Sequence, residues 1–107
     1  MNLTNFENMP DTKAGEHAAE VYQIIRGYSS SRPIKSYKIE RWLGVSGATV
    51  RGAVSLLREN GFRVCSGGRG YYYDYSGKET AKTVAHLRQR AKRMLNVANK
   101  LEESYAE

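Results

Sequence analysis

The sequence predicts a mainly α-helical domain with a small β-hairpin, followed by one long C-terminal helix. Three observations lead to this fold class. Apolar residues recur at spacings of three and four over residues 13–28, 36–43 and 46–59, which is the period of an amphipathic helix. Two short runs rich in strand formers flank the glycine-rich segment 66–70, as in a hairpin. Residues 78–105 contain neither glycine nor proline, so one uninterrupted helix can span them.

Composition and charge limit what the chain can be. Its 107 residues suffice for one small domain and little more, and they carry a net charge of +6 with a pI of about 9.6. A basic balance of this size favours a polyanionic partner. The sequence has no apolar run of about 18 residues and no secretory leader, so we expect no membrane span. The single cysteine, Cys65, cannot form an internal disulfide and indicates the reducing cytoplasm.

The chain divides into three predicted segments. Residues 1–12 are polar and aperiodic, and we expect a disordered tail there. Residues 13–75 form the globular domain, which begins with a helix over Lys13–Tyr28 that ends before Pro33. Residues 76–107 form the long C-terminal helix, which we expect to serve oligomerisation.

Two helices joined by a very short turn form the centre of the predicted domain. Ser36 is a good N-cap for the first of them, and Gly44 supplies the left-handed residue that ends it. Ser46 caps the next helix only two residues later. A connection this short makes the helices cross steeply, which is helix-turn-helix geometry. We expect Val45 to fill the space between them and Trp42 to lie beside the apolar face.

The predicted hairpin has a tip that combines three glycines with one cation. The alternating run 62–65 and the run 71–73 are the strands, and Ser66-Gly67-Gly68-Arg69-Gly70 joins them. Because successive side chains of a strand point to opposite faces, we expect Tyr71 and Tyr73 in the core and Tyr72 on the other side.

The last helix carries a heptad pattern and an unusual charge distribution. The capping-box sequence Ser76-Gly77-Lys78-Glu79 marks its start. Basic residues crowd its first two-thirds and glutamates, Glu107 among them, end it, which opposes the helix dipole, so a partner is expected to use these charges. DNA and an antiparallel partner helix are both open, and so is a helix that folds back on its own domain. The expected oligomer interface consists of the heptad a and d positions Val84, Leu87, Ala91, Met94, Ala98, Leu101 and Tyr105.

The order of these elements resembles that of winged-helix repressors of the biotin-operon and GntR types. The resemblance covers residues 15–75, and small phage-encoded proteins look similar over the whole length. It implies a winged helix-turn-helix domain that binds double-stranded DNA as a transcriptional regulator. The motifs that carry it are Leu43-Gly44-Val45-Ser46, Thr49-Val50-Arg51, Leu57-Arg58-Glu59-Asn60-Gly61 and the wing-like Gly68-Arg69-Gly70-Tyr71.

In such a domain the third helix is the recognition helix, whose first residues meet base edges in the major groove. Arg51 can then contact a guanine, and Thr49 can reach a phosphate or a thymine methyl group. The sequence departs from the pattern of these repressors at Gly47 and Gly52, where such proteins commonly carry Arg or another polar residue. The surface expected to face DNA consists of Ser46, Gly47, Ala48, Thr49, Arg51, Gly52 and Ser55.

The hairpin and the second helix add further candidates for DNA contact. Arg69 can enter a minor groove from the hairpin tip, and Tyr72 can touch the sugar-phosphate backbone. Lys35, Lys38 and Arg41 suit phosphate contacts, which position a protein without reading sequence. The alternative for these cations is a solvated surface. A run of tyrosines can instead stack on the bases of a single strand.

The sequence lacks catalytic and metal-binding patterns. One cysteine, with His17 and His86 far apart, does not have the spacing of a zinc site. Segment 66–70 joins two strands and opens no helix, so it is not a phosphate-binding loop. We therefore expect a protein that is not an enzyme and needs no cofactor and no metal.

Duplex-DNA binding by a homodimeric regulator is the function that these observations favour. Two rival hypotheses stay open. The first is a protein-interaction module, such as a phage inhibitor of a host factor, and the second is a DNA-packaging or replication protein that binds without sequence specificity. Gly47 and Gly52 favour the protein partner, whereas Arg69 and the basic charge favour DNA.

Overall fold

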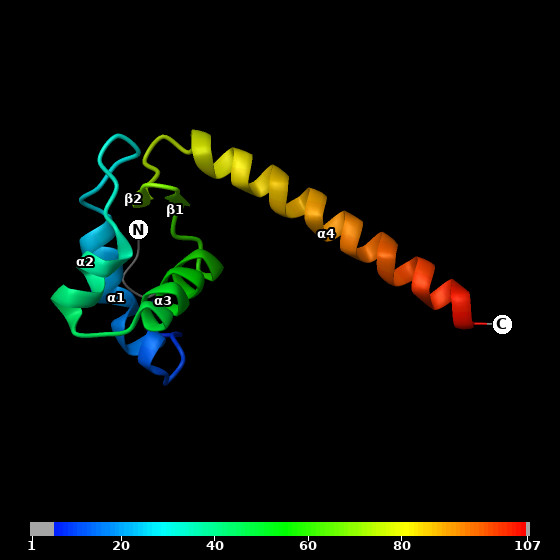
Figure 1. Cartoon of the computed structure of the whole chain (residues 1–107), viewed down its shortest axis with the longest axis horizontal. Helices are drawn as coiled ribbons and strands as arrows, with labels where there is room; N and C mark the ends of the chain where they lie inside the picture. The colour runs from blue at the N-terminus through cyan, green and yellow to red at the C-terminus, as the bar shows by residue number, and fades with distance from the viewer. Residues whose placement is uncertain (1–5, 107) are drawn as a thin grey trace. The chain divides into compact units, whose positions relative to one another are not determined.

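The structure, a computed structural model, describes residues 6–106, which divide into two units at the Tyr75–Ser76 junction. The described residues form four helices and one antiparallel two-stranded sheet, so the predicted mainly α-helical fold with a small hairpin and a long C-terminal helix is confirmed (Figure 1). The elements of the first unit are α1 (Lys13–Ile25), α2 (Ser36–Leu43), α3 (Gly47–Glu59), β1 (Val64–Gly67) and β2 (Gly70–Tyr73), and the second unit consists of α4 (Lys78–Tyr105).

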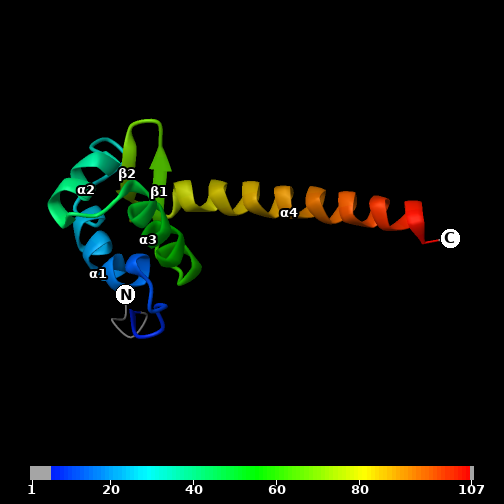
Figure 2. The same ribbon diagram turned by 60° about the horizontal axis from the view of Figure 1, so that its bottom comes forward.

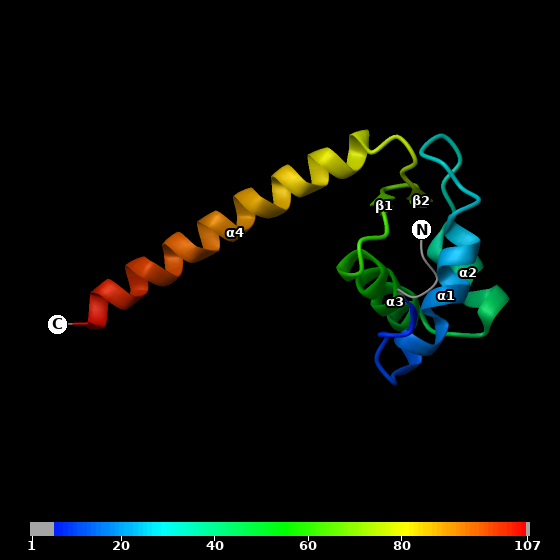
Figure 3. The same cartoon turned by 180° about the vertical axis from the view of Figure 1, so that it is seen from behind.

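The core of the first unit lies mainly between α1 and α3, which pack side by side in the front and rear views (Figures 1 and 3). The apolar faces predicted for both helices are confirmed. Burial of these faces provides the main driving force for folding, at about 25 cal/mol per Å² of apolar surface. The fully or nearly fully buried core side chains of the two helices are Ala18, Val21, Ile25, Val50, Ala53, Val54 and Leu57.

Gly52 allows α1 and α3 to approach closely. A Cβ atom at this position would lie 2.9 Å from the Cβ of Ala14 on α1, which is closer than real Cβ atoms come. Gly52 therefore faces α1, and its predicted place on the DNA-facing surface is wrong. Gly47 differs, because a Cβ there would meet only the side-chain ends of Arg51 and Glu40, at 3.3 and 3.4 Å.

The turn between α2 and α3 has the predicted glycine and the predicted helix cap. Gly44 adopts a left-handed conformation with φ of 66°. Glycine has no Cβ atom, so this conformation has no steric cost. Ser46 caps α3, since its side chain accepts a hydrogen bond from the backbone N–H of Thr49 at 3.1 Å. Val45 is half-buried against the core, as expected.

The start of α2 differs from the prediction. Lys35, and not Ser36, occupies the N-cap position, and no side chain caps the helix. Ser36 lies inside the first turn, where its hydroxyl donates a hydrogen bond to Glu40 Oε2 at 2.9 Å. A serine in the first turn of a helix can form a hydrogen bond with its hydroxyl, just as a serine at the N-cap can. The presence of Ser36 alone therefore does not fix the residue at which α2 begins.

The segment before α1 packs on the domain. The ring of Phe6 lies 5.0 Å from that of Phe62 and 5.9 Å from that of Tyr22, and Met9 also contacts the core. The predicted disordered tail is therefore wrong for residues 6–12, because Phe6 and Met9 supply apolar surface to bury. The rest of that prediction, residues 1–5, lies outside the described residues.

Partial burial and the neighbouring Tyr73 raise the pKa of the Tyr22 phenol.

The hairpin is antiparallel, with Val64 opposite Tyr73 and Cys65 opposite Tyr72 (Figure 2). Tyr73 is buried and Tyr71 packs partly against the core, as predicted, whereas Tyr72 is half-buried.

α1 ends at Ile25, three residues before the predicted end at Tyr28. Tyr28 is instead held to the hairpin, because its carbonyl accepts a hydrogen bond from the N–H of Tyr73 at 3.0 Å.

α4 is a single helix of 28 residues, as predicted, but the predicted capping box does not form. Its N-cap is Gly77 with φ of 81°, and no side chain caps it. Ser76 lies one residue too early and accepts a hydrogen bond from the N–H of Lys78 at 3.2 Å. α4 has no buried residues, since a single helix cannot bury its own apolar stripe from Val84 to Tyr105. None of the helices in the described residues has the length and apolar character to span a bilayer.

The two glycines of α3 give a matched test of the helix packing. Gly52→Ala is expected to lower the free energy of unfolding by about 1 kcal/mol, because overpacking against Ala14 costs about 1–3 kcal/mol and the gain in helix propensity returns about 1 kcal/mol. Gly47→Ala is expected to leave stability unchanged or to raise it slightly. Urea denaturation of both variants measures the difference, and a Gly52→Ala protein as stable as Gly47→Ala contradicts the packing.

Candidate nucleic-acid interface

A pair of backbone hydrogen bonds holds the hairpin against the segment that leads into α2. The N–H of Ile34 donates to the carbonyl of Tyr71, and the N–H of Tyr71 donates to the carbonyl of Ile34, both at 2.8 Å. Gly70 makes this approach possible, because a Cβ at that position would overlap the backbone of Ile34. Its φ of 133° is also a conformation that other residues rarely adopt. The hairpin tip is thereby fixed beside the start of α2.

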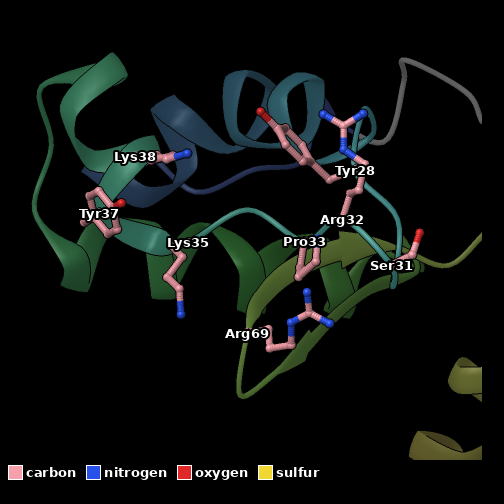
Figure 4. A pocket seen from close by; sticks show the side chains of 8 residues that line it. All are labelled: Tyr28, Ser31, Arg32, Pro33, Lys35, Tyr37, Lys38 and Arg69. Carbon is pink, nitrogen blue, oxygen red and sulfur yellow. The ribbon is translucent and has the colours of Figure 1, made fainter.

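A groove of about 510 Å³ lies where the hairpin tip meets the α1–α2 connection and α2 (Figure 4). Four cationic side chains surround it, and in the part of the chain that the structure describes none of the four forms an ion pair. Figure 4 shows Arg69 on the hairpin across from the side chains of the α1–α2 connection. We call this hollow the basic groove; its lining residues are Tyr28, Ser31, Arg32, Pro33, Lys35, Tyr37, Lys38 and Arg69.

The basic groove continues onto the exposed face of α2. A second hollow, of about 480 Å³, is lined by Tyr37, Lys38, Arg41 and Trp42, so it shares Tyr37 and Lys38 with the basic groove. The structure thus brings Lys35, at the N-cap of α2, and Lys38 and Arg41 of α2 onto one surface with Arg69 of the hairpin. The expectation that Trp42 lies beside the apolar face needs correction, because 60% of this side chain is exposed.

The exposed face of α3 is poorer in side chains than predicted. Thr49 is 9% exposed, and its hydroxyl contacts that of Ser46 at 3.1 Å, so little of its side chain is accessible to a partner. The Ser46 side chain is likewise used as the helix cap. Ala48, Arg51 and Ser55 are exposed as expected, and Arg51 is the one long cation among them.

Glu40 adds a negative charge beside the start of α3. A Cβ at Gly47 would lie 3.4 Å from Glu40 Oε2 and 3.3 Å from an Arg51 guanidinium nitrogen, so both side chains reach the same place. The Ser36 hydroxyl holds the carboxyl in position. A carboxylate here repels phosphate and makes this end of α3 less favourable for DNA than the basic groove.

Arg58 links α3 to the hairpin and was not identified from the sequence. Its Nε donates to the carbonyl of Val64 at 2.8 Å, and its guanidinium also donates to the Ser66 hydroxyl at 3.2 Å. These bonds hold β1 against α3, so the charge of Arg58 is used inside the domain. In the sequence, Arg58 stands out only as part of the motif Leu57-Arg58-Glu59-Asn60-Gly61.

Arg32, Tyr28 and Tyr37 are further surface residues of the basic groove that sequence analysis did not select. Arg32 continues the three-residue spacing of Lys35, Lys38 and Arg41, which was a usable signal. The tyrosines gave no comparable signal, because their place beside Arg69 depends on the tertiary pairing of Ile34 with Tyr71.

Within residues 6–106, no group of three or more His, Cys, Asp or Glu side chains is placed to hold a metal ion. His17 instead pairs with Glu20 at 2.8 Å. Comparisons with protein-family models, curated proteins and solved structures give no match.

Gly70→Ala tests whether the glycine fixes the hairpin. The added Cβ and the positive φ are expected to lower the free energy of unfolding by about 1–3 kcal/mol and to speed hydrogen exchange at the Tyr71 amide. Gly68→Ala is the matched control at the same tip, because no atom lies within 4 Å of its Cβ position. Equal stability and equal Tyr71 exchange in the two variants would show that the close approach to Ile34 is not required.

Proposed function

We propose that this chain is a winged-helix protein that binds duplex DNA, regulates transcription and acts as a homodimer through α4. The observation that carries the proposal is the basic groove, with Arg32, Lys35, Lys38 and Arg69 around one open surface. A phosphate backbone is the partner that best matches four cations that form no ion pair within the described residues. The likeness of the element order to biotin-operon and GntR-type repressors supports the same proposal.

In this proposal the DNA backbone lies along the basic groove. Lys35, Lys38 and Arg41 of α2 bind phosphates, and Arg69 reaches a groove of the duplex from the hairpin tip. The exposed side chains of α3 that can read bases are Arg51 and Ser55, because Gly47 and Ala48 have little or no side chain. Binding is therefore expected to depend more on phosphates and DNA shape than on base-specific hydrogen bonds.

The apolar stripe of α4 supports self-association. A single helix cannot bury its a and d residues within itself, and Met94, Leu101 and Tyr105 are large apolar side chains among them. A second copy is the simplest partner, because a two-fold pair buries the same stripe on both chains. A dimer would also present two DNA-binding units to paired half-sites.

A protein partner is the second candidate, and one observation favours it. The first turn of α3 combines small residues, Gly47 and Ala48, with the carboxylate of Glu40, and this patch suits a protein surface better than a phosphate backbone. A phage inhibitor of a host factor would use such a patch. Neither the DNA-binding function nor the protein-binding function needs a cofactor. The single Cys65 suits the reducing cytoplasm in which we place the chain.

Salt dependence tests the DNA proposal. Four cationic contacts with DNA, from Lys35, Lys38, Arg41 and Arg69, predict that log affinity for a duplex falls with log salt at a slope of about −3.6. Arg69→Ala is expected to flatten that slope by about 0.9, to weaken binding by about 1–3 kcal/mol and to leave the melting temperature unchanged. Fluorescence anisotropy of a labelled duplex at several salt concentrations measures both effects.

Lys13→Ala is the control, since it removes an exposed cation outside the basic groove from the same unit. It should leave the slope unchanged. Absence of duplex binding at low salt would contradict the DNA proposal, and a loss for Lys13→Ala equal to that for Arg69→Ala would contradict the assignment to the groove.

The dimer proposal is tested by two variants that add the same charge to α4. Leu101→Asp places a carboxylate in the apolar stripe and is expected to yield monomers, because a charge buried between helices is costly. Asn96→Asp, at an outward heptad position, should leave the assembly intact. Sedimentation equilibrium at micromolar concentration separates these outcomes, and a monomeric full-length chain would show that the dimer is wrong.

A further inference from the structure

The exposed face of α2 carries two aromatic rings that the core does not use. Tyr37 is 51% and Trp42 is 60% exposed, and neither belongs to the hydrophobic cluster. Large aromatic side chains on a surface are costly to leave in water, so these two rings point to a partner with an apolar face of its own.

Each ring has a cation one helical turn away. Tyr37 and Arg41 are four residues apart, as are Lys38 and Trp42, so all four side chains share one side of α2, and they line one hollow. A surface on which aromatic rings alternate with cations matches the requirements of a single nucleic-acid strand, whose bases stack on rings while its phosphates meet cations.

This surface is continuous with the basic groove, because Tyr37 and Lys38 line both hollows. A strand that leaves the basic groove along α2 therefore meets Tyr37 first and Trp42 next. The tyrosine run of the hairpin does not offer the same opportunity, since Tyr73 is buried and Tyr71 packs against the core.

We propose that this face of α2 binds unpaired bases of a single-stranded DNA segment that continues from a duplex held in the basic groove. The bases stack on Tyr37 and Trp42, while Lys38 and Arg41 bind the phosphates. The inference rests on the proposed DNA-binding function for its polyanionic partner, and it adds a preference for a junction between duplex and single strand.

Trp42 is the only tryptophan of the chain, so its fluorescence reports on this face directly. The experiment titrates the full-length protein with oligo-dT of about 12 nucleotides, a length within the usual site sizes for single strands, and with an abasic strand of the same length. Stacking predicts that oligo-dT quenches Trp42 emission and that the abasic strand, although it binds, does not. Saturable oligo-dT binding without a change in Trp42 emission would overturn the inference.

Two variants separate stacking from charge, with labelled strands followed by anisotropy. Trp42→Ala is expected to weaken oligo-dT binding by about tenfold and to leave abasic-strand binding unchanged, and Trp42→Phe should restore most of the loss. Lys38→Ala should weaken both strands and flatten the salt slope by about 0.7. Equal losses on both strands for Trp42→Ala, without rescue by Trp42→Phe, would overturn the stacking role.

A blunt duplex and the same duplex with a single-stranded dT extension distinguish this inference from the proposed function. Tighter binding of the extended duplex, abolished by Trp42→Ala, supports both. Equal binding of the two duplexes overturns the inference and leaves the duplex proposal standing. Binding and Trp42 quenching by oligo-dT without any duplex binding would support stacking and overturn the proposed function.

Discussion

The pairing of Ile34 with Tyr71 determines where the candidate interface lies. These two hydrogen bonds join residues that are 37 positions apart in the sequence, and they bring the hairpin tip beside the start of α2. Without this pairing, Arg69 and Lys35 would be two unrelated surface cations. With it, they share a groove with Arg32 and Lys38, and the positive charge of the domain acquires a defined location.

Glycine governs close approaches at several points of this domain. Gly70 admits the backbone of Ile34, and Gly52 admits Ala14. Gly44 supplies the left-handed turn between α2 and α3. The close approaches at Gly70 and Gly52 each bring together segments that are distant in the sequence. These two glycines therefore stabilise tertiary structure and not only local turns. Gly52 therefore needs no bound partner to explain it, since its close approach to α1 accounts for it.

Most of the helices and strands could be predicted from the sequence because their signals are local. Apolar periodicity, Gly44 and Ser46 fix the α2–α3 turn, and the unbroken heptad pattern fixes α4. The helix starts at Ser36 and Ser76 were misplaced by one residue, because a serine hydroxyl can bond on either side of a helix boundary.

The candidate surface was predicted only in part, and the reason is again physical. Lys35, Lys38, Arg41 and Arg69 were recognised by charge, which needs no tertiary information. The orientation of α3 about its own axis depends on tertiary packing. Helical spacing left Thr49 near the exposed edge of α3, but the structure buries this residue. Glu40 and the exposed Trp42 also follow from how α2 packs, which composition does not reveal.

In the proposed complex, DNA lies along the basic groove and makes few contacts with α3. Titration of the isotope-labelled full-length chain with a blunt duplex, followed by amide chemical shifts, tests it most directly. The account predicts the largest shifts within residues 32–42 and at Arg69, with small shifts at Ala48 and Ser55. Shifts confined to α3, with the residues of the basic groove unaffected, would contradict it.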